Sequence, residues 1–225
     1  MSVHDTIVAI ATPPGTGGIG ILRLSGSKAL SIAEALSHSK LKPAVIQFRR
    51  FLEADGEAID HGLCLYFKAP HSFSGEDCVE VQAHGGPVVL DMLLQRVCTL
   101  GARLARAGEF SERAFLNGKV DLTQAEAIAD LIESGSRAAS RAAMRSLEGR
   151  FSEQVNKLVE KVINLRIYIE AALDFAEEEI DFLNSSDISE RLDAAILQLQ
   201  ALLQQAQQGR TLQEGLSVAL AGRPN

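Results

Sequence analysis

The character of the sequence changes near Lys119, and this change constrains the fold more than any other feature. Before it, short strand-like runs alternate with glycine turns. After it, apolar residues recur every three or four positions, which is the spacing of helices that pack against other helices. The clearest such seam contains Leu147, Phe151, Val155, Leu158, Val162, Leu165 and Ile169. We therefore predict an α+β N-terminal domain, with a mixed sheet and flanking helices, followed by an α-helical bundle segment.

Short strands and two helices are predicted in the first part. Asp55-Gly56 separates two strand-like runs and is typical of a β-hairpin turn. Pro87 stands in the first turn of an apolar-striped helix, where the missing N–H does no harm. The predicted strands are 6–11, 19–24, 45–52, 59–67 and 79–82, and the predicted helices are 27–36 and 87–100.

Three helices are predicted in the second part. Thr123 and Glu126 have the spacing of a capping box and open an alanine-rich helix. The long apolar seam forms the second helix, which is interrupted over 184–187. The third helix covers 188–208 and ends at Gly209.

The last residues resemble the start of a nucleotide-binding motif. Leu216 to Ala221 alternates like a strand and runs into Gly222-Arg223-Pro224-Asn225. A strand that feeds a glycine turn is how a P-loop opens, but the lysine and Ser/Thr that hold phosphate and magnesium are absent. We expect these residues to be the start of a truncated domain that cannot act on a nucleotide alone.

Composition and charge narrow the class of protein. The formal net charge of -7 argues against a surface broadly adapted to nucleic acid, so any contact with RNA would be local. No apolar run spans a bilayer, and the first residues lack the basic start of a secretory signal. Cys64, Cys78 and Cys98 are too widely spaced for a disulfide framework or a zinc site. We expect a cytoplasmic protein with reduced, mostly buried thiols and no membrane contact.

Two glycine motifs leave alternatives open. Gly15 to Gly20 fits G-x-G-x-x-G, but a dinucleotide site needs a helix to follow, and Ile21 to Gly26 is strand-like. The remaining interpretations are a glycine loop that closely approaches a ligand or partner, or a flexible connection. His84 to Pro87 ends a strand and opens a helix, so its N–H groups either hold an anion or form a tight turn.

Charged side chains on the strands also have more than one interpretation. Arg23 shares a strand face with Ile19 and Ile21, so its guanidinium is paired with another group, meets an anion or reaches water from an edge strand. Glu80 either binds a ligand or occupies the solvent face of a half-buried strand.

Charges on the helices are equally ambiguous. Arg137, Arg141 and Arg145 recur every four residues, and such a stripe is solvated, paired with acidic neighbours or in contact with phosphate. Glu177 to Glu179 with Asp181 either bind a cation or form an exposed acidic turn.

Taken together, these segments resemble the MnmE (TrmE) family of tRNA-modification GTPases over the full length of the chain. The longest matching block runs from Gly108 to Ala127. The other matching stretches are Asp5–Ala9, Pro13–Gly15, Gly17–Arg23, Ser72–Asp77, His84–Gly86 and Glu177–Ile180. The chain departs from the family at Ala107 and Ala176, where proline is expected.

The resemblance implies a folate-binding and dimerising domain at 1–119, the first part of a helical domain at 120–212, and the first strand and start of the P-loop of a GTPase domain at 213–225. It implies that the full-length protein works with FAD-dependent MnmG on tRNA. Together they would add an aminomethyl or carboxymethylaminomethyl group to C5 of the wobble uridine. The one-carbon donor would be 5-formyl- or 5,10-methylene-tetrahydrofolate, and GTP hydrolysis would need potassium and magnesium.

Carried over position by position, the resemblance assigns the folate contacts to Arg23, Glu80 and Lys119. Glu80 would accept paired hydrogen bonds from the donor edge of a pterin, and the two cations would meet the carboxylates of the ligand. Asn225 matches the P-loop asparagine that contacts GTP and potassium. No catalytic residue is expected within the chain.

Three hypotheses therefore stand. The first is a chain that binds folate and forms a homodimer but lacks GTPase activity. The alternative is a dimerisation scaffold without independent folate binding. A stand-alone GTPase is disfavoured because the P-loop lysine is absent.

Overall fold

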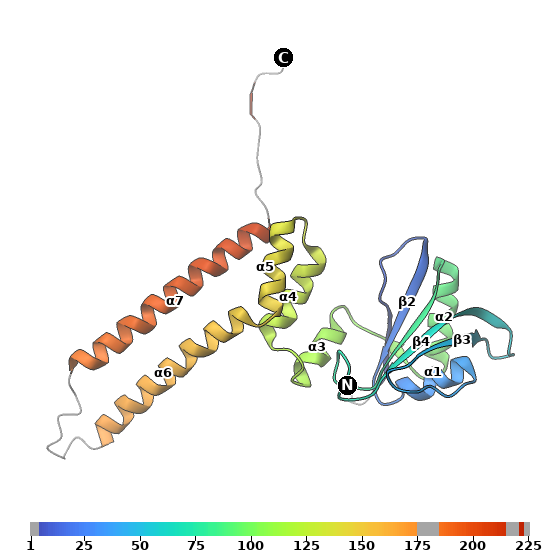
Figure 1. Ribbon diagram of the computed structural model, residues 1–225, viewed down its shortest axis with the longest axis horizontal. Coiled ribbons are helices and arrows are strands. Elements are labelled where there is room, and N and C mark those ends of the chain that lie inside the picture. Colours follow the sequence, from blue (N-terminus) through green and yellow to red (C-terminus); the bar gives the residue numbers. More distant parts are fainter. Residues whose placement is uncertain (1–4, 175–184, 215–220, 223–225) are drawn as a thin grey trace. The chain divides into compact units, whose positions relative to one another are not determined.

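A computed structural model describes residues 5–174, 185–214 and 221–222 of the chain. These residues form two compact units, which are divided between Val120 and Asp121. The first unit combines a sheet with helices, and the second is helical (Figure 1). This arrangement confirms the predicted fold class.

A six-stranded mixed sheet organises the N-terminal unit. Its strand order is β3-β4-β5-β2-β1-β6, and all neighbours are antiparallel except β1 and β6. The strands are β1 (Ile7–Ile10), β2 (Gly17–Ser25), β3 (Ile46–Leu52), β4 (Ala58–Phe67), β5 (Cys78–Gly85) and β6 (Arg103–Leu104). The predicted hairpin at Asp55-Gly56 is confirmed, since β3 and β4 pair across it.

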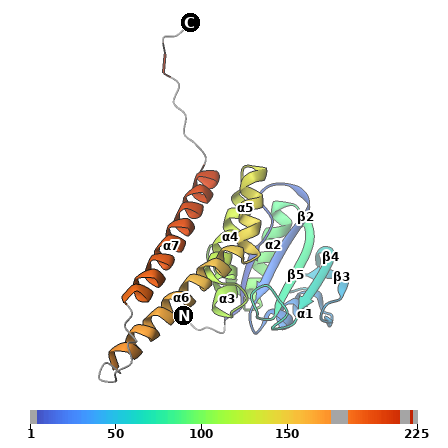
Figure 2. The same cartoon turned by 60° about the vertical axis from the view of Figure 1, so that its left-hand side comes forward.

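Two helices cover one face of this sheet (Figure 2). They are α1 (Ala29–Ser37) and α2 (Pro87–Thr99), which lie close to the predicted bounds. Because strand side chains alternate between the two faces, every second residue of a strand reaches the core beneath these helices. The core includes Val8, Leu22, Leu24, Cys64, Tyr66, Val79 and Val81 from the strands and Ile32, Leu36, Leu93 and Val97 from the helices.

The opposite face of the sheet, which we call the open sheet face, carries the other alternate residues. The register places Arg23 opposite Glu80 and Glu80 opposite Leu65. The next row consists of Ile21, Gln82 and Leu63. These side chains are half-buried, so the face remains accessible.

A short helix completes the N-terminal unit. Helix α3 (Glu109–Leu116) follows β6, and its buried residues include Glu109 and Arg113. Sequence reasoning missed this helix, because charged residues at its buried positions hide the apolar periodicity on which a helix prediction depends.

Four helices form the described part of the second unit. They are α4 (Leu122–Glu133), α5 (Arg137–Leu147), α6 (Arg150–Asp174) and α7 (Ser185–Glu214). Helix α4 packs on α5, and α6 lies beside α7. The prediction of one continuous seam from Leu147 is wrong at its start, since Leu147 ends α5. Gly149 has φ +84, and this left-handed backbone separates α5 from α6.

Two predicted helix ends are also wrong. Asp121, rather than Thr123, is the N-cap of α4, and its carboxylate accepts a hydrogen bond from the N–H of Gln124. The Gln124 side chain in turn accepts one from the N–H of Asp121, which completes a capping box. Helix α7 continues through Gly209 to Glu214, because a glycine in a helix costs only about 1 kcal/mol and does not by itself end it. The predicted strand at 216–221 falls almost entirely outside the described residues.

Candidate functional site

Two of the predicted site residues, Arg23 and Glu80, form an ion pair on the open sheet face. Nε and Nη2 of Arg23 both donate to Oε1 of Glu80, at 3.0 and 2.7 Å. The interpretation of Arg23 as an edge-strand residue is wrong, since β2 lies between β5 and β1. Both side chains keep some contact with solvent, with exposed fractions of 31% for Arg23 and 18% for Glu80.

The ion pair leaves part of each polar group available. Within the described part of the chain, Oε2 of Glu80 and Nη1 of Arg23 have no hydrogen-bond partner. A carboxylate oxygen accepts hydrogen bonds, and a guanidinium N–H donates them. The pair can therefore bind a ligand that offers N–H groups to Glu80 and an oxygen to Arg23.

Apolar side chains lie on one side of the pair. Leu65 of β4 lies directly opposite Glu80, and Leu63 occupies the neighbouring row. Ile46 and Phe48 of β3 extend this surface to the edge of the sheet and are 64% and 65% exposed. An exposed apolar surface with a few central polar groups is typical of a ligand site or a protein interface.

Two aromatic rings flank the guanidinium of Arg23. Its Cζ lies 5.6 Å from the ring centroid of Phe73 and 6.0 Å from that of Phe110. Phe73 lies on the loop 68–77 between β4 and β5, and Phe110 lies on α3. A cation at these distances is attracted to the face of a ring. Neither ring was predicted, because an isolated phenylalanine outside a periodic pattern carries no local signal.

Lys119, the third predicted residue, contacts the loop that carries Phe73. Its Nζ donates to the carbonyl oxygen of Pro70 at 3.0 Å. A Cβ added to Gly75 would lie 3.1 Å from Cγ of Lys119, so the two segments pack closely. No described contact joins Lys119 to Arg23 or Glu80. The structure thus brings Arg23 and Glu80 together and links Lys119 to them only through the loop 68–77.

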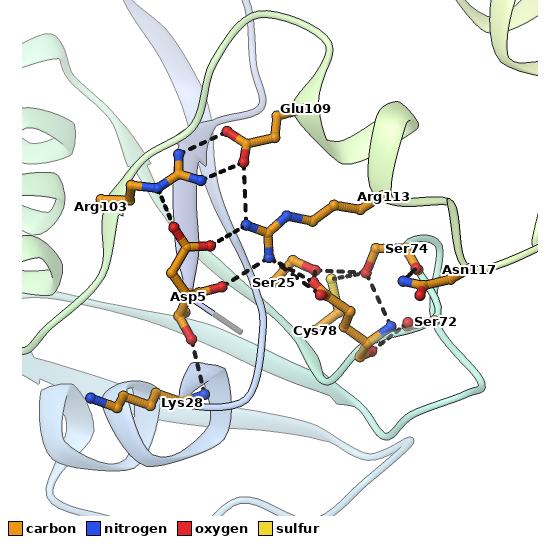
Figure 3. Close-up of polar contacts among 12 residues, drawn as sticks. Asp5, Ser25, Lys28, Ser72, Ser74, Cys78, Arg103, Glu109, Arg113 and Asn117 are labelled. Carbon is orange, nitrogen blue, oxygen red and sulfur yellow. Dashed lines mark hydrogen bonds and ion pairs between the residues drawn. The ribbon is translucent and has the colours of Figure 1, made fainter. Parts of the chain in front are cut away.

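A network of buried and half-buried charges holds α3 and the loop 68–77 to the sheet (Figure 3). Arg113 of α3 donates to Oδ1 of Asp5 at 2.6 Å and to Oε2 of Glu76 at 3.0 Å. Arg103 of β6 donates to Oδ2 of Asp5 at 2.6 Å and to both carboxylate oxygens of Glu109. Sequence reasoning missed this network, since its members are scattered along the N-terminal unit.

The network keeps its carboxylates charged and its segments in place. Hydrogen bonds from Arg103 lower the pKa of Glu109 to about 2, although its side chain is only 3% exposed. The same arginine is the main cause that lowers the pKa of Asp5. Ser25 Oγ donates to Glu76 at 2.7 Å and connects the network to β2. Because Phe73 and Phe110 lie on the two segments that the network holds, it positions their rings beside Arg23.

Internal packing accounts for one glycine in each of the two glycine motifs, Gly20 and Gly85. Gly17 to Gly20 belong to β2, and a Cβ at Gly20 would lie 2.6 Å from the side chain of Leu90 on α2. A Cβ at Gly85 would lie 2.7 Å from the carbonyl oxygen of Gly17. The close approach at these two positions is therefore to the protein's own helix and strand, and the segment 84–87 makes the turn from β5 into α2.

The remaining predicted residues fall into three groups. Arg137, Arg141 and Arg145 lie exposed on α5. The acidic cluster 177–181 and Asn225 lie outside the described residues. Cys64 and Cys78 are buried free thiols, as predicted, and burial raises the pKa of both.

The described ranges contain no candidate metal site and no candidate membrane span. There, no group of three His, Cys, Asp or Glu side chains could hold a metal ion. None of the helices described is both long and apolar enough to cross a membrane.

Comparisons with known proteins match both units. Residues 6–119 match the family described as GTP-binding protein TrmE N-terminus, and residues 122–217 match the MnmE helical domain. The tRNA modification GTPase MnmE of Legionella pneumophila (strain Paris) is 58% identical over 222 residues, which are 98% of this chain and 50% of that protein. The tRNA modification GTPase MnmE of Hydrogenovibrio crunogenus (strain DSM 25203 / XCL-2) is 56% identical over 224 residues, which are 100% of this chain and 50% of that protein. The chain spans about half the length of the curated relatives it matches.

Proposed function

The chain belongs to the MnmE (TrmE) family of tRNA-modification GTPases, and from this membership we propose that its N-terminal unit, residues 1–119, binds a tetrahydrofolate at the Arg23–Glu80 pair. One observation carries the proposal: a carboxylate and a guanidinium are paired beside the apolar side chains of Leu63 and Leu65 and beside two aromatic rings. A pterin has matching chemistry, since it is a flat ring with hydrogen-bond donors along one edge.

Each polar group has a role in this proposal. Oε2 of Glu80 accepts N–H groups from the donor edge of the pterin, and charge-assisted bonds of this kind are the strong ones. Phe73 and Phe110 hold the guanidinium of Arg23 and offer apolar walls to the ring. Lys119 uses the two donors that its bond to Pro70 leaves, and these meet the carboxylate tail of the folate. The 5-formyl and 5,10-methylene forms both fit this description.

Isothermal titration with 5-formyltetrahydrofolate tests the folate site. Glu80→Gln should weaken binding roughly 10- to 100-fold, since a hydrogen bond to a charged group contributes about 1.5–3 kcal/mol. The matched control is Glu57→Gln, the same change at an exposed position in the β3–β4 turn, which should leave the affinity unchanged. A folded wild-type chain that releases no heat at saturating folate would contradict the proposal and favour a dimerisation scaffold without independent folate binding.

We also infer that the N-terminal unit forms a homodimer. Strand β3 lies at one edge of the sheet, where its outward N–H and C=O groups face no other strand of the described sheet. Such an edge pairs readily with another chain, and the exposed Ile46 and Phe48 would add apolar contact. Phe48→Lys should weaken the dimer at least about tenfold, because a charge on an edge strand opposes pairing.

Sedimentation equilibrium measures this dimer. Arg50→Lys is the matched control, since it lies on the same strand and keeps its charge. Equal dimer affinities for the wild-type chain and Phe48→Lys would place the interface elsewhere.

For the full-length protein we propose the activity of the family in the cytoplasm. Residues 120–212 form the first part of its helical domain, and residues 213–225 begin a GTPase domain. Asn225 contacts GTP and potassium there, and magnesium assists GTP hydrolysis. With MnmG, the protein adds an aminomethyl or carboxymethylaminomethyl group to C5 of the wobble uridine of tRNA. The names of the relatives support the tRNA and GTPase parts of this proposal.

The 225 residues alone should not hydrolyse GTP, because the P-loop lysine and Ser/Thr are not among them. Potassium-stimulated GTP turnover by this chain would overturn that expectation.

A further inference from the structure

Three arginines form a stripe on α5 of the helical unit. Arg137, Arg141 and Arg145 recur every four residues, so they follow one another about 6 Å apart along the helix axis. All three are exposed, whereas Ala139 and Ala143 on the same helix are buried. The two small alanines allow α5 to pack closely within the helical unit, and the three arginines stay exposed to solvent.

The three arginines differ from other cations of the same unit. Arg150, Lys157, Arg166 and Arg191 each lie within 3.7 Å of a carboxylate, in every case two to four residues away. No ion pair joins the α5 arginines to any of the residues described in the structure, and α5 itself contains no acidic residue. At four-residue spacing each arginine has another arginine of the stripe as its neighbour, and Glu148, three residues after Arg145, is paired with Arg150.

This arrangement is unfavourable for the helix alone. Like charges four residues apart repel each other and weaken a helix. The chain as a whole is acidic, with a net charge of -7, so the stripe is a local exception. Bound anions would remove the repulsion, and a row of anions at regular spacing would do so along the whole stripe.

A hollow of about 540 Å³ lies at the start of the stripe. Its lining consists of Ser134, Gly135, Ser136, Arg137, Ser140 and Arg141. Serine hydroxyls, backbone N–H groups and arginines are the groups that contact phosphate and sugar in protein–nucleic acid interfaces. The hollow therefore adds hydrogen-bonding groups of the same class to the positive charge of the stripe.

We propose that the arginine stripe of α5, together with this hollow, binds the phosphate backbone of RNA. The proposed function enters this proposal at one point, where it identifies the bound RNA as tRNA. Contacts of this kind position a nucleic acid and do not read its sequence. The stripe thus holds the body of the tRNA, and recognition of the wobble base belongs to other residues.

Fluorescence anisotropy of the full chain with a labelled, unmodified tRNA transcript tests this surface over a range of KCl concentrations. Each phosphate contact contributes about 0.7–0.9 to the slope of log K against log salt. Replacing Arg137, Arg141 and Arg145 together by glutamine should make the slope shallower by about 2–3 and lower the low-salt affinity at least about tenfold. The corresponding triple lysine variant should keep most of the slope, because lysine still binds phosphate as a point charge.

A matched triple variant, Lys157→Gln with Arg166→Gln and Arg191→Gln, removes the same number of charges from paired positions and should leave the slope nearly unchanged. Thermal unfolding of the α5 glutamine variant should show no loss of stability, since the change removes repulsion. Three results would overturn the inference. The α5 glutamine variant could keep the salt slope of the wild-type chain, or the matched variant could lose as much slope as the α5 variant. The wild-type chain could also bind polyglutamate as tightly as it binds tRNA. Folate titration of the same proteins does not depend on tRNA binding. A failure to bind folate would overturn the proposed folate site and leave the evidence for RNA binding by the arginine stripe unaffected.

Discussion

Arg113 connects acidic groups from three separate parts of the N-terminal unit. Its guanidinium donates to Asp5, Glu76 and Glu109, and the side chain is only 11% exposed. Arg113→Met should lower the free energy of unfolding by about 3–5 kcal/mol, because Glu76 loses its cationic partner and Asp5 and Glu109 each keep only their pairing with Arg103 or Arg106.

Urea unfolding near neutral pH measures this loss. Lys40→Ala provides the contrast, since it breaks an ion pair with Glu34 in which the lysine is 91% exposed. That change should cost at most about 1 kcal/mol. Losses of similar size in the two variants would show that the network contributes no more than an ordinary surface pair.

The same network makes stability depend on acid pH. The pKa of Glu109 is about 2 in the folded protein, against an ordinary value of 4.5. Its stabilising effect is complete above about pH 4.5 and is lost as the pH falls towards 2, because there the unfolded chain binds a proton that the folded chain excludes. Glu109→Gln should flatten this part of the stability curve. Unfolding at a series of pH values measures the slope, and an equal slope in both proteins would contradict the assignment.

Single residues show where sequence reasoning stops. The resemblance to a known family selected Arg23 and Glu80, but their pairing across 57 positions depends on the register of β2 and β5. Asp5 and Arg113 are 108 positions apart. Neither pairing has a local signal, since each arises only when distant strands and helices are packed together.

At the scale of elements, the alignment of β4 with β5 sets the geometry of the open sheet face. Gly62 of β4 lies against the backbone of β5, and a Cβ there would overlap the carbonyl oxygen of Gln82. Gly62→Ala should therefore lower the free energy of unfolding by about 1–3 kcal/mol, as overpacking does, and weaken folate binding with it. Gly18→Ala on β2 meets nothing within 4 Å and should change stability by less than about 0.5 kcal/mol. Chemical denaturation measures the free energy of unfolding of the two variants. Equal values would contradict the predicted role of Gly62.

Elements with a strong local signal were predicted, and elements that depend on one residue's conformation were not. Asp55-Gly56 marked the hairpin, and Pro87 marked the start of α2. The break at Gly149 was missed, because a glycine inside an apolar periodic run does not reveal whether its φ is positive. The cap of α4 was misplaced because Asp121 and Thr123 are both suitable capping residues by type.

At the scale of the whole molecule, the helical unit exposes a large amount of apolar surface. Leu165, Ala195 and Leu202 are buried in this unit. Many other apolar residues of α6 and α7 are exposed, namely Val159, Val162, Ile163, Ile167, Leu173, Leu192, Ile196, Leu197, Leu199 and Leu203. Val159, Val162, Ile163 and Ile167 recur every three or four residues and so share one face of α6, and soluble proteins rarely leave such a face uncovered. We therefore predict that this chain associates through α6 and α7.

Sedimentation velocity over a range of protein concentrations tests this association. The background is Phe48→Lys, so that pairing through β3 does not contribute. Ile163→Glu with Ile167→Glu should shift the distribution towards the monomer, because two carboxylates one turn apart oppose apolar contact and repel each other. Arg166→Glu, which changes charge at a neighbouring exposed polar position, should leave the association in place. If the Phe48→Lys chain with α6 and α7 unchanged stays monomeric at every concentration, these helices tolerate water on their apolar faces and the prediction is wrong.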